Sequence, residues 1–253
     1  MKNNNNISAL IITYNEVNHI EEAINTVSFA DEIIVVDSNS TDGTLEKLSK
    51  LKNVKTICRE FKNFSDQRNF AIKQAKFDWI LFLDADERIP ETLKNEIIEV
   101  TNQTNNIAGF MVNRLYFFKK KRIRFSGFQT DTTYRLFKNG NVKYIENKFV
   151  HELPEVNGET AMLKNKMLHY CFDSAKHYKT KMEHYAKLKA LELHKKGKKT
   201  NTIQRTLRSV YKFIVNYIFR LGFLDGKEGL QICYLSAYGV YFRYKELKKL
   251  NNN

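Results

Sequence analysis

Short apolar runs alternate with segments of helical spacing along the first hundred residues. The candidate strands are the β-rich apolar runs at residues 7–13, 32–37, 54–58 and 79–83. Apolar residues at helical spacing predict helices over residues 19–29, 45–51 and 65–75, and Pro90 opens another that runs to about residue 100. Strands and helices alternating in this way predict βαβ units and a parallel sheet covered by helices on both faces.

The pattern changes after residue 100. Short strands are predicted at residues 108–118, 122–125, 132–137, 142–145 and 166–170, and Asn139-Gly140 is a tight hairpin signal. Helices are predicted over residues 174–195, 202–219 and 226–250, with breaks near Gly197 and Gly222. We therefore expect an α/β domain over residues 1–172 and a helical extension over residues 173–253.

Polar clusters follow three of the predicted strands. They are TYNE at residues 13–16, DSNSTDGT at residues 37–44 and DADE at residues 84–87. Ligands of open α/β sheets bind outside the carboxyl ends of the strands. The three clusters therefore predict one ligand-binding crevice.

Asp84 and Asp86 stand one residue apart at the end of an apolar run, ILFLDADE. Two carboxylates on one side of an extended chain repel each other unless a cation lies beside them. Oxygen ligands favour Mg²⁺ or Mn²⁺, which commonly bridge to phosphate. The alternative is a strand end followed by a solvated acidic turn, with Asp86 and Glu87 near a helix start.

Asp37 ends the run EIIVVD and precedes a segment of small residues that contains Gly43. A carboxylate here accepts hydrogen bonds from a ribose or a base edge, and glycine lets the backbone approach a ligand. The alternative is an Asp turn with a helix cap. Thr13, Asn15 and Glu16 have the same two interpretations.

The formal net charge of +14 is concentrated in the last third of the chain. Residues 173–253 hold 18 Lys and Arg against 6 Asp and Glu, a surplus of 12, whereas residues 1–172 have a surplus of 2. A basic tail of this kind suits an anionic surface, either nucleic acid or lipid. Three widely spaced cysteines argue against a disulfide framework or a zinc site and favour a reducing cytoplasm.

TYNE, VVDSNSTDGT and LDADE, in this order, resemble the pattern of glycosyltransferase family 2 on a GT-A fold. The segment FSDQRNFAIKQAKFDWILFLD resembles that family too, and the match covers about residues 7–100. Looser similarity continues in DTTYRLFKNGNVKYIENKFVHE and in FRLGFLDGKEGLQICYLSAYGVYFRY. These segments resemble the subgroup that extends the lipopolysaccharide inner core, such as the glucosyltransferases acting on core heptose.

The resemblance implies a nucleoside-diphosphate sugar donor, usually with UDP, and an inverting transfer to a glycan or lipid-linked acceptor. It implies that Asp84 lies near the ribose and the metal, that Asp86 is the ligand of Mn²⁺ or Mg²⁺, and that the nucleoside is held by Thr13, Asn15, Glu16 and Asp37. Arg68, on a predicted helix, is a candidate for contact with the diphosphate.

Inversion needs a general base on the acceptor hydroxyl. Asp131 stands where the subgroup has an aspartate shortly before its RLF segment, so it is the predicted base, with a turn residue as the alternative. His151 is a candidate metal ligand or diphosphate contact, with a hydrogen-bonded strand-end histidine as the alternative. Arg135 contacts phosphate or pairs with an acid.

Two apolar stretches of the tail, at residues 210–219 and 229–242, are each shorter than the roughly 20 residues that span a bilayer. Aromatic and basic side chains lie together in them, which suits a lipid headgroup interface. We therefore expect a peripheral protein on the cytoplasmic face of the inner membrane. The alternative for the tail is a helical bundle packed on the catalytic domain.

Other functions explain less of the sequence. A nucleic-acid-binding protein would explain the charge but not the three polar clusters at strand ends. A sugar nucleotidyltransferase would share the sheet, but no Gly-rich, Arg-containing loop follows the first strand. We therefore expect no nucleic acid partner.

Overall fold

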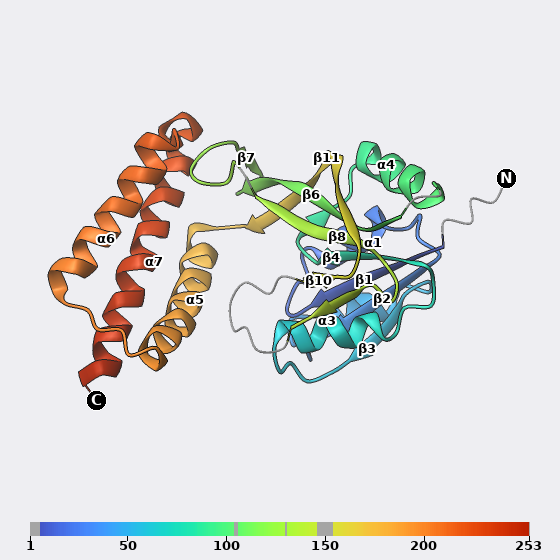
Figure 1. The fold of residues 1–253 in the computed structure, drawn as a ribbon, viewed down its shortest axis with the longest axis horizontal. Coiled ribbons are helices and arrows are strands. Elements are labelled where there is room, and N and C mark those ends of the chain that lie inside the picture. The colour runs from blue at the N-terminus through green and yellow to red at the C-terminus, as the bar shows by residue number, and fades with distance from the viewer. Residues whose placement is uncertain (1–5, 104–105, 130, 146–153, 253) are drawn as a thin grey trace. The chain divides into compact units, whose positions relative to one another are not determined.

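A computed structural model describes residues 6–103, 106–129, 131–145 and 154–252 (Figure 1). The chain forms two compact units. The sheet unit is Met1–Arg114 with Thr132–His169, and the helical unit is Leu115–Asp131 with Tyr170–Asn253. The helical unit thus contains the predicted extension together with an internal segment that the sequence placed in the α/β domain.

The first half of the sheet unit follows the predicted βαβ pattern. Strands β1 (Ile7–Thr13), β2 (Glu32–Asp37), β3 (Lys55–Cys58) and β4 (Trp79–Asp84) are parallel, in the order β3-β2-β1-β4. The accompanying helices are α1 (Ile20–Thr26), α2 (Thr44–Ser49), α3 (Phe64–Ile72) and α4 (Glu91–Asn102). The predicted parallel sheet and its helices are confirmed, with end points that differ by a few residues.

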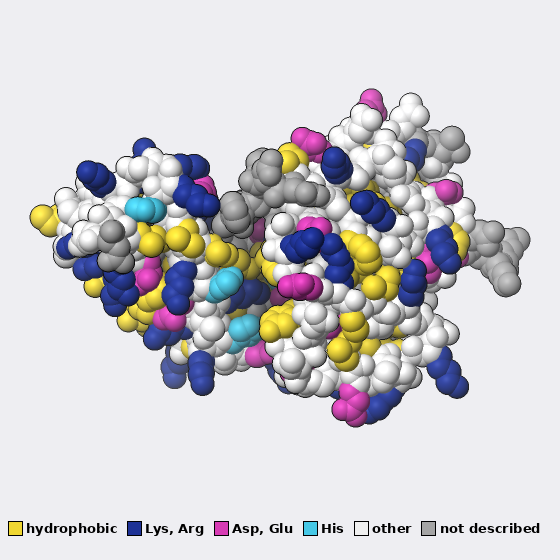
Figure 2. Space-filling view, turned by 90° about the horizontal axis from the view of Figure 1, so that it is seen from below, with side chains coloured by type: hydrophobic (Ala, Val, Ile, Leu, Met, Phe, Trp, Pro, Cys, Tyr) yellow, Lys and Arg dark blue, Asp and Glu magenta, His cyan; other side chains and the backbone are white. Residues whose placement is uncertain are grey.

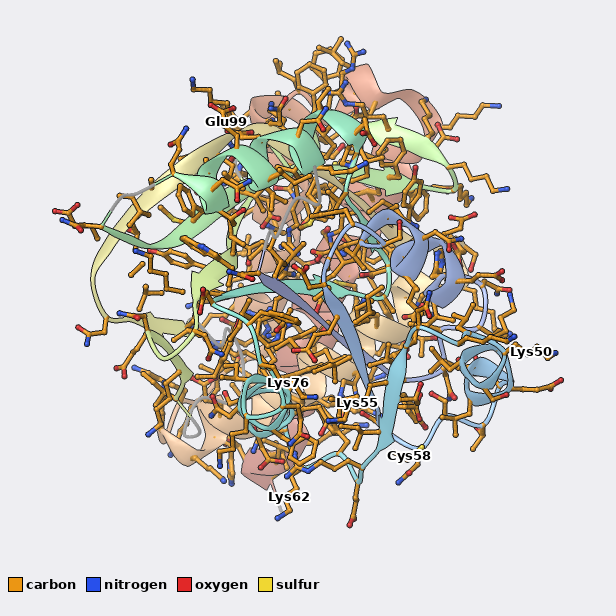
Figure 3. All side chains as sticks on the ribbon, turned by 90° about the vertical axis from the view of Figure 1, so that its right-hand side faces the viewer. Lys50, Lys55, Cys58, Lys62, Lys76 and Glu99 are labelled. Carbon is orange, nitrogen blue, oxygen red and sulfur yellow. The ribbon has the colours of Figure 1, made fainter. Side chains whose placement is uncertain are left out.

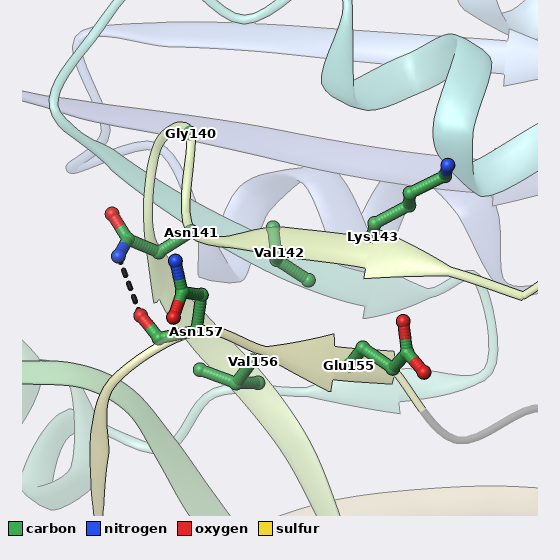
Figure 4. Close-up of a pocket in the computed structure, with 7 residues that line it drawn as sticks. All are labelled: Gly140, Asn141, Val142, Lys143, Glu155, Val156 and Asn157. Carbon is green, nitrogen blue, oxygen red and sulfur yellow. Dashed lines mark hydrogen bonds between the residues drawn. The ribbon is translucent and has the colours of Figure 1, made fainter.

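Antiparallel strands complete the sheet. After β4 come β8 (Thr132–Lys138), β6 (Ile107–Phe118), β11 (Glu159–Phe172) and β5 (Glu87–Arg88). A separate two-stranded sheet joins β9 (Val142–Tyr144) to β10 (Pro154–Val156). A shallow pocket beside this pair includes Asn141 and Asn157 (Figure 4). Asn141 Nδ2 donates a hydrogen bond to Asn157 O.

The hairpin predicted at Asn139-Gly140 is wrong. A tight turn does form there, because Asn141 N donates to Lys138 O. The strands on either side nevertheless pair with different partners: β8 lies between β4 and β6, and β9 pairs with β10. Leu136 and Phe137 of β8 are fully buried in the main sheet. This burial explains why β8 pairs with β4 and β6 and does not form a hairpin with β9.

The core of the sheet unit has two layers because successive strand residues face opposite sides. On β1, Ile7, Ala9 and Ile11 pack into one apolar cluster with α1 and α4. Leu10 and Ile12 pack into the other cluster. Charged side chains such as Lys50, Lys62 and Glu99 lie outside and are exposed (Figure 3).

The helical unit contains β7 (Lys121–Ile123), α5 (Ala175–Lys195), α6 (Thr202–Ile214), the π-helical turn η1 (Val215–Phe219), the 3₁₀ turn η2 (Gly222–Asp225) and α7 (Gly226–Asn252). The three predicted helices and the breaks near Gly197 and Gly222 are confirmed. Tyr116, Phe118 and Phe172 form its core with Tyr178 of α5 and Ile232 of α7.

Candidate active site

The three polar clusters meet at one edge of the parallel sheet. Thr13 of β1 pairs with Asp37 of β2, and Ile12 of β1 pairs with Asp84 of β4. The carboxyl ends of these neighbouring strands therefore lie within one residue of each other. Residues of the three clusters therefore lie on neighbouring strand ends, as the sequence predicts.

The loops after β1 and β2 are fastened to each other. Thr41 N donates to Asn15 Oδ1 at 2.8 Å, and Asn15 N donates to Ser40 Oγ at 2.8 Å. The fully buried Asp37 accepts from Ser40 N at 2.7 Å and from Ser40 Oγ at 2.6 Å. Asp37 thus forms the Asp turn that the sequence allowed, and an ionised carboxylate retains further lone pairs for a ligand.

The backbones of Glu16 and Thr13 also form hydrogen bonds at this edge. Glu16 N donates to Thr44 Oγ1 at 3.0 Å, which ties the first loop to the start of α2. Thr13 O accepts from Ser38 N. The Thr13 hydroxyl is buried and has no hydrogen-bond partner among the residues that the structure describes. A buried hydroxyl normally finds a partner, so this one is suited to a ligand atom.

Asp84 lies between two arginines at the end of β4. Arg135 Nη2 is 2.6 Å from Asp84 Oδ2, and Arg68 Nη2 is 3.0 Å from Asp84 Oδ1. Burial disfavours the charged form of Asp84, but the guanidinium groups of Arg135 and Arg68 outweigh it and hold the pKa of Asp84 below its usual range. Arg135 therefore pairs with an acid, one of its two sequence interpretations.

Glu87 anchors the other end of this network. Its side chain is fully buried and accepts from Arg135 Nε and Nη2 at 2.8 Å each and from Arg114 Nη1 at 3.0 Å. Its Oε2 also accepts from Asp84 N. The alternative that placed Glu87 in a solvated acidic turn is therefore wrong, because the arginines of β6 and β8 neutralise it inside the fold.

Asp86 contacts a histidine of β11. Its Oδ2 lies 3.2 Å from His169 Nε2, since His169 pairs with Glu87 in the β11–β5 ladder. No local pattern marks His169 as a site residue, because only the strand pairing brings it to this turn. Asp86 and His169 offer an oxygen and a nitrogen of the kinds that bind divalent ions.

A metal ion at Asp86 and His169 would need further ligands from a bound substrate. No group of three or more His, Cys, Asp or Glu side chains that could hold an ion occurs within the described residues. Mg²⁺ is commonly held by one or two carboxylates together with substrate phosphates. Asp84 Oδ1 and Oδ2 each accept from an arginine, and Asp86 Oδ2 lies beside His169 Nε2.

Two predicted residues remain, Asp131 and His151. Asp131 belongs to the helical unit, where Tyr116 Oη donates to its Oδ2 at 2.7 Å. His151 falls outside the described residues.

A family model described as Glycosyl transferase family 2 matches residues 8–170. The chain belongs to this family. An uncharacterized glycosyltransferase of Rickettsia conorii is 28% identical over 96% of this chain and 90% of its own length. The lipopolysaccharide core biosynthesis glycosyltransferase LpsC of Rhizobium meliloti is 25% identical over 94% of this chain and 93% of its own length.

Two solved structures are similar to this chain. The mannosyltransferase PcManGT of Pyrobaculum calidifontis, in complex with GDP-Man and Mn²⁺, matches with a TM-score of 0.50 and 12% identity over 92% of this chain and 73% of that chain. S. aureus TarS 1–349 in complex with UDP matches with a TM-score of 0.48 and 16% identity over 97% of this chain and 91% of that chain.

The family 2 chain thus has the predicted GT-A fold and is a glycosyltransferase. The family resemblance predicted from TYNE, DSNSTDGT and DADE is confirmed. The comparisons give no support to a nucleic-acid-binding protein or a sugar nucleotidyltransferase.

Proposed function

We propose that the protein is a metal-dependent, inverting hexosyltransferase that uses a nucleoside-diphosphate sugar, with UDP as the expected nucleotide. Its proposed acceptor is a lipopolysaccharide core or another cell-envelope glycan. The observation that carries this proposal is the convergence of Thr13, Asp37 and Asp84 at neighbouring strand ends inside the region that matches the family. In this proposal residues 1–172 are the catalytic domain and residues 173–253 are its basic extension.

The nucleoside is assigned to the edge formed by Thr13, Asn15, Glu16 and Asp37. Two facts support this assignment: the Thr13 hydroxyl is buried with no partner among the described residues, and the loops after β1 and β2 are fixed to each other. A rigid edge of this kind reduces the entropy lost on binding.

The diphosphate is assigned to Arg68, with Asp84 beside the ribose and the cation. Arg68 is supported by its 3.0 Å contact with Asp84 Oδ1, which holds the guanidinium at the end of β4. Guanidinium groups bind phosphate oxygens in a two-pronged geometry. Donor binding would then place phosphate against an arginine that is already oriented by Asp84.

Asp86 is assigned to Mn²⁺ or Mg²⁺, with His151 as a further ligand or a diphosphate contact. When bound, such an ion neutralises negative charge that develops on the departing diphosphate. The assignment of Asp86 is supported by its 3.2 Å contact with His169 Nε2, which brings together an oxygen and a nitrogen of the kinds that bind divalent ions.

Asp131 is assigned as the general base. The acceptor oxygen bonds to the anomeric carbon as the bond from that carbon to the diphosphate oxygen breaks, and the hydroxyl proton passes to the Asp131 carboxylate. The 2.7 Å hydrogen bond from Tyr116 Oη to Asp131 Oδ2 supports this role, because it fixes the orientation of the carboxylate.

The acceptor is assigned to the cell envelope, and the protein to the cytoplasmic face of the inner membrane. The name of the relative LpsC supports the first assignment, and the surplus of 12 positive charges in residues 173–253 supports the second. Among the described residues, no helix is long and apolar enough to cross a membrane.

Thermal shift and calorimetry with a donor panel test the proposal. UDP-glucose, UDP-galactose, UDP-N-acetylglucosamine and GDP-mannose are each titrated with and without Mn²⁺. We expect one donor to stabilise the protein, and Mn²⁺ to strengthen that effect in the parent but not in Asp86→Asn. Glu91→Gln is the matched control, because Glu91 is an exposed carboxylate of the same unit. Uptake of neither cation nor nucleotide by the parent would contradict the proposal.

The same donor then tests the base. Asp131→Asn is expected to lower turnover by about 100-fold or more while donor affinity stays unchanged, because a positioned base contributes to the reaction and not to donor binding. Unchanged turnover would place the base elsewhere without affecting the donor site.

A further inference from the structure

Helix α6 is amphipathic, but its apolar face points outward. Apolar side chains recur along it and into η1 at the spacing of one helix face. The members of this outward stripe are Ile203, Leu207, Val210, Tyr211, Ile214 and Ile218, and all of them are exposed. Ile203 and Tyr211 are each 70% exposed, and α6 buries none of its residues fully.

The opposite face of α6 is largely polar and lies against α7 (Figure 1). Ser209 Oγ donates to Ala237 O at 2.7 Å, and the Arg205 guanidinium lies 4.4 Å from the centre of the Tyr241 ring. Arg208 Nη1 donates to Tyr244 Oη at 3.0 Å. These contacts fix the rotation of α6, so the outward direction of the stripe is a consequence of specific packing.

Further apolar side chains are exposed after α6 along the chain. Phe219 of η1 is 75% exposed, and Phe223 and Leu224 of η2 are also exposed. Hydrophobic side chains are visible on the surface of the helical unit with Lys and Arg beside them (Figure 2). Soluble proteins rarely expose a contiguous apolar surface of this kind unless it binds a partner or a membrane.

Positive charge stands at both ends of the stripe. Lys198 and Lys199 precede α6 and Arg220 follows η1, and all three are exposed. In a two-fold antiparallel pair of stripes, Lys198 and Lys199 of one copy would face Arg220 of the other, so like charges would oppose a second copy as the occupant. Phosphate headgroups would instead neutralise these charges, while acyl chains would cover the stripe.

We propose that α6 and η1 lie in the plane of an anionic membrane surface, with the outward stripe in the acyl boundary and Lys198, Lys199 and Arg220 among the headgroups. A helix of 13 residues is about 20 Å long, which suits an in-plane position. The inference rests on the proposed function only for the membrane-bound acceptor that such an anchor would serve.

Vesicle flotation tests the inference with the full chain. The vesicles contain phosphatidylethanolamine with phosphatidylglycerol, or phosphatidylcholine alone. The stripe variant is Leu207→Gln with Ile214→Gln, and the matched control is Met162→Gln with Leu191→Gln, two side chains that are each 45% exposed outside the stripe. We expect the parent to favour anionic vesicles, the stripe variant to lose about tenfold or more of its partition constant, and the control to stay within about twofold of the parent.

The depth of α6 in the membrane is tested with the variant Tyr211→Trp, whose fluorescence is measured in vesicles that carry brominated acyl chains as quenchers. The parent, with its single Trp79 buried in the sheet unit, supplies the background. We expect quenching well above that background. Equal flotation of parent and stripe variant, or no added quenching, would overturn the inference.

Two further measurements separate the possible explanations. Light scattering without vesicles is expected to give a single chain of 29.8 kDa. A dimeric parent with a monomeric stripe variant would make the stripe a protein interface and overturn the inference. UDP calorimetry is expected to be the same for parent and stripe variant. If neither UDP nor any donor of the panel bound to either protein while the difference in flotation persisted, the proposed function would be refuted and the membrane inference would stand.

Discussion

Soluble proteins usually bury apolar side chains and expose charged ones. The turn between β4 and β5 with its partner arginines, here called the β4–β5 corner, and helix α6 both depart from this rule, in opposite directions. At the corner, Glu87 and Arg135 are charged and buried. On α6, Leu207 and Tyr211 are apolar and exposed. Charged residues are rarely buried unless they are paired, and clustered apolar residues are rarely exposed without a role in binding.

The two regions differ in whether their unusual side chains have partners within the protein. The corner satisfies its charges internally, because Glu87 meets Arg114 and Arg135, and Asp84 meets Arg68 and Arg135. The stripe of α6 has no such internal partner among the described residues, since its polar side faces α7. We conclude that the corner is part of the fold itself, whereas the stripe is directed at something outside the chain.

The largest expected effect comes from breaking the corner. Glu87→Ala leaves two guanidinium groups buried without their shared carboxylate, and removal of one partner from a buried ion pair costs about 3–5 kcal/mol. Urea unfolding followed by Trp79 fluorescence reports on the sheet unit specifically, because Trp79 is the only tryptophan and lies in β4.

Glu91→Ala is the control for that loss. The Glu91 side chain is 71% exposed at the start of α4 and pairs with Lys94. Exposed ion pairs contribute about 0.2–1 kcal/mol, so a small change is expected here. Equal losses for Glu87→Ala and Glu91→Ala would show that the corner is hydrated, and the comparison with α6 would fail.

Substitutions of two leucines test the α6 part of the comparison, and their expected effect on the free energy of unfolding is intermediate. Leu247 of α7 is fully buried and Leu207 of α6 is 63% exposed. Leu247→Ala is expected to cost about 2–5 kcal/mol, and Leu207→Ala no more than about 0.5 kcal/mol, because only the first leaves a cavity. Guanidinium unfolding followed by the far-ultraviolet helix signal measures both. A large loss for Leu207→Ala would mean that the stripe supports the fold.

The parallel half of the sheet was predictable because its signals are local. Apolar periodicity located β1, β2 and β4, and the polar residues at their ends marked one edge of a parallel sheet. The partners of Glu87 were not predictable in this way. Arg114 and Arg135 are 27 and 48 residues away along the chain, on antiparallel strands whose order no local pattern fixes.

Helix α6 shows a second limit of the sequence pattern. Spacing predicted a helix there, and it also identified aromatic and basic side chains suited to a lipid interface. It did not determine which face packs on α7, because a helix of the same pattern ordinarily buries its apolar side. The contacts of Ser209 and Arg205 with α7 decide that question, and their partners stand 28 and 36 positions later in the chain.

The smallest expected effect concerns a surface carboxylate of the helical unit, Glu192, which contrasts with the buried Glu87. Hydrogen bonds from Lys189 and Lys196 lower the pKa of Glu192 from 4.5 to about 2. A folded-state pKa below the unfolded value means that these pairs stabilise the fold above about pH 4.5 and lose their effect as the pH falls toward about 2.

After allowance for solvent screening, Glu192→Gln is expected to cost about 0.5 kcal/mol near pH 7 and almost nothing near pH 2. Guanidinium unfolding of parent and variant at both pH values measures the difference, and carboxyl NMR gives the titration directly. If the loss were as large as that of Glu87→Ala, or independent of pH, surface and buried carboxylates would contribute alike in this protein. A small, pH-dependent loss would instead separate this exposed carboxylate from the β4–β5 corner, where burial excludes the water that weakens an ion pair.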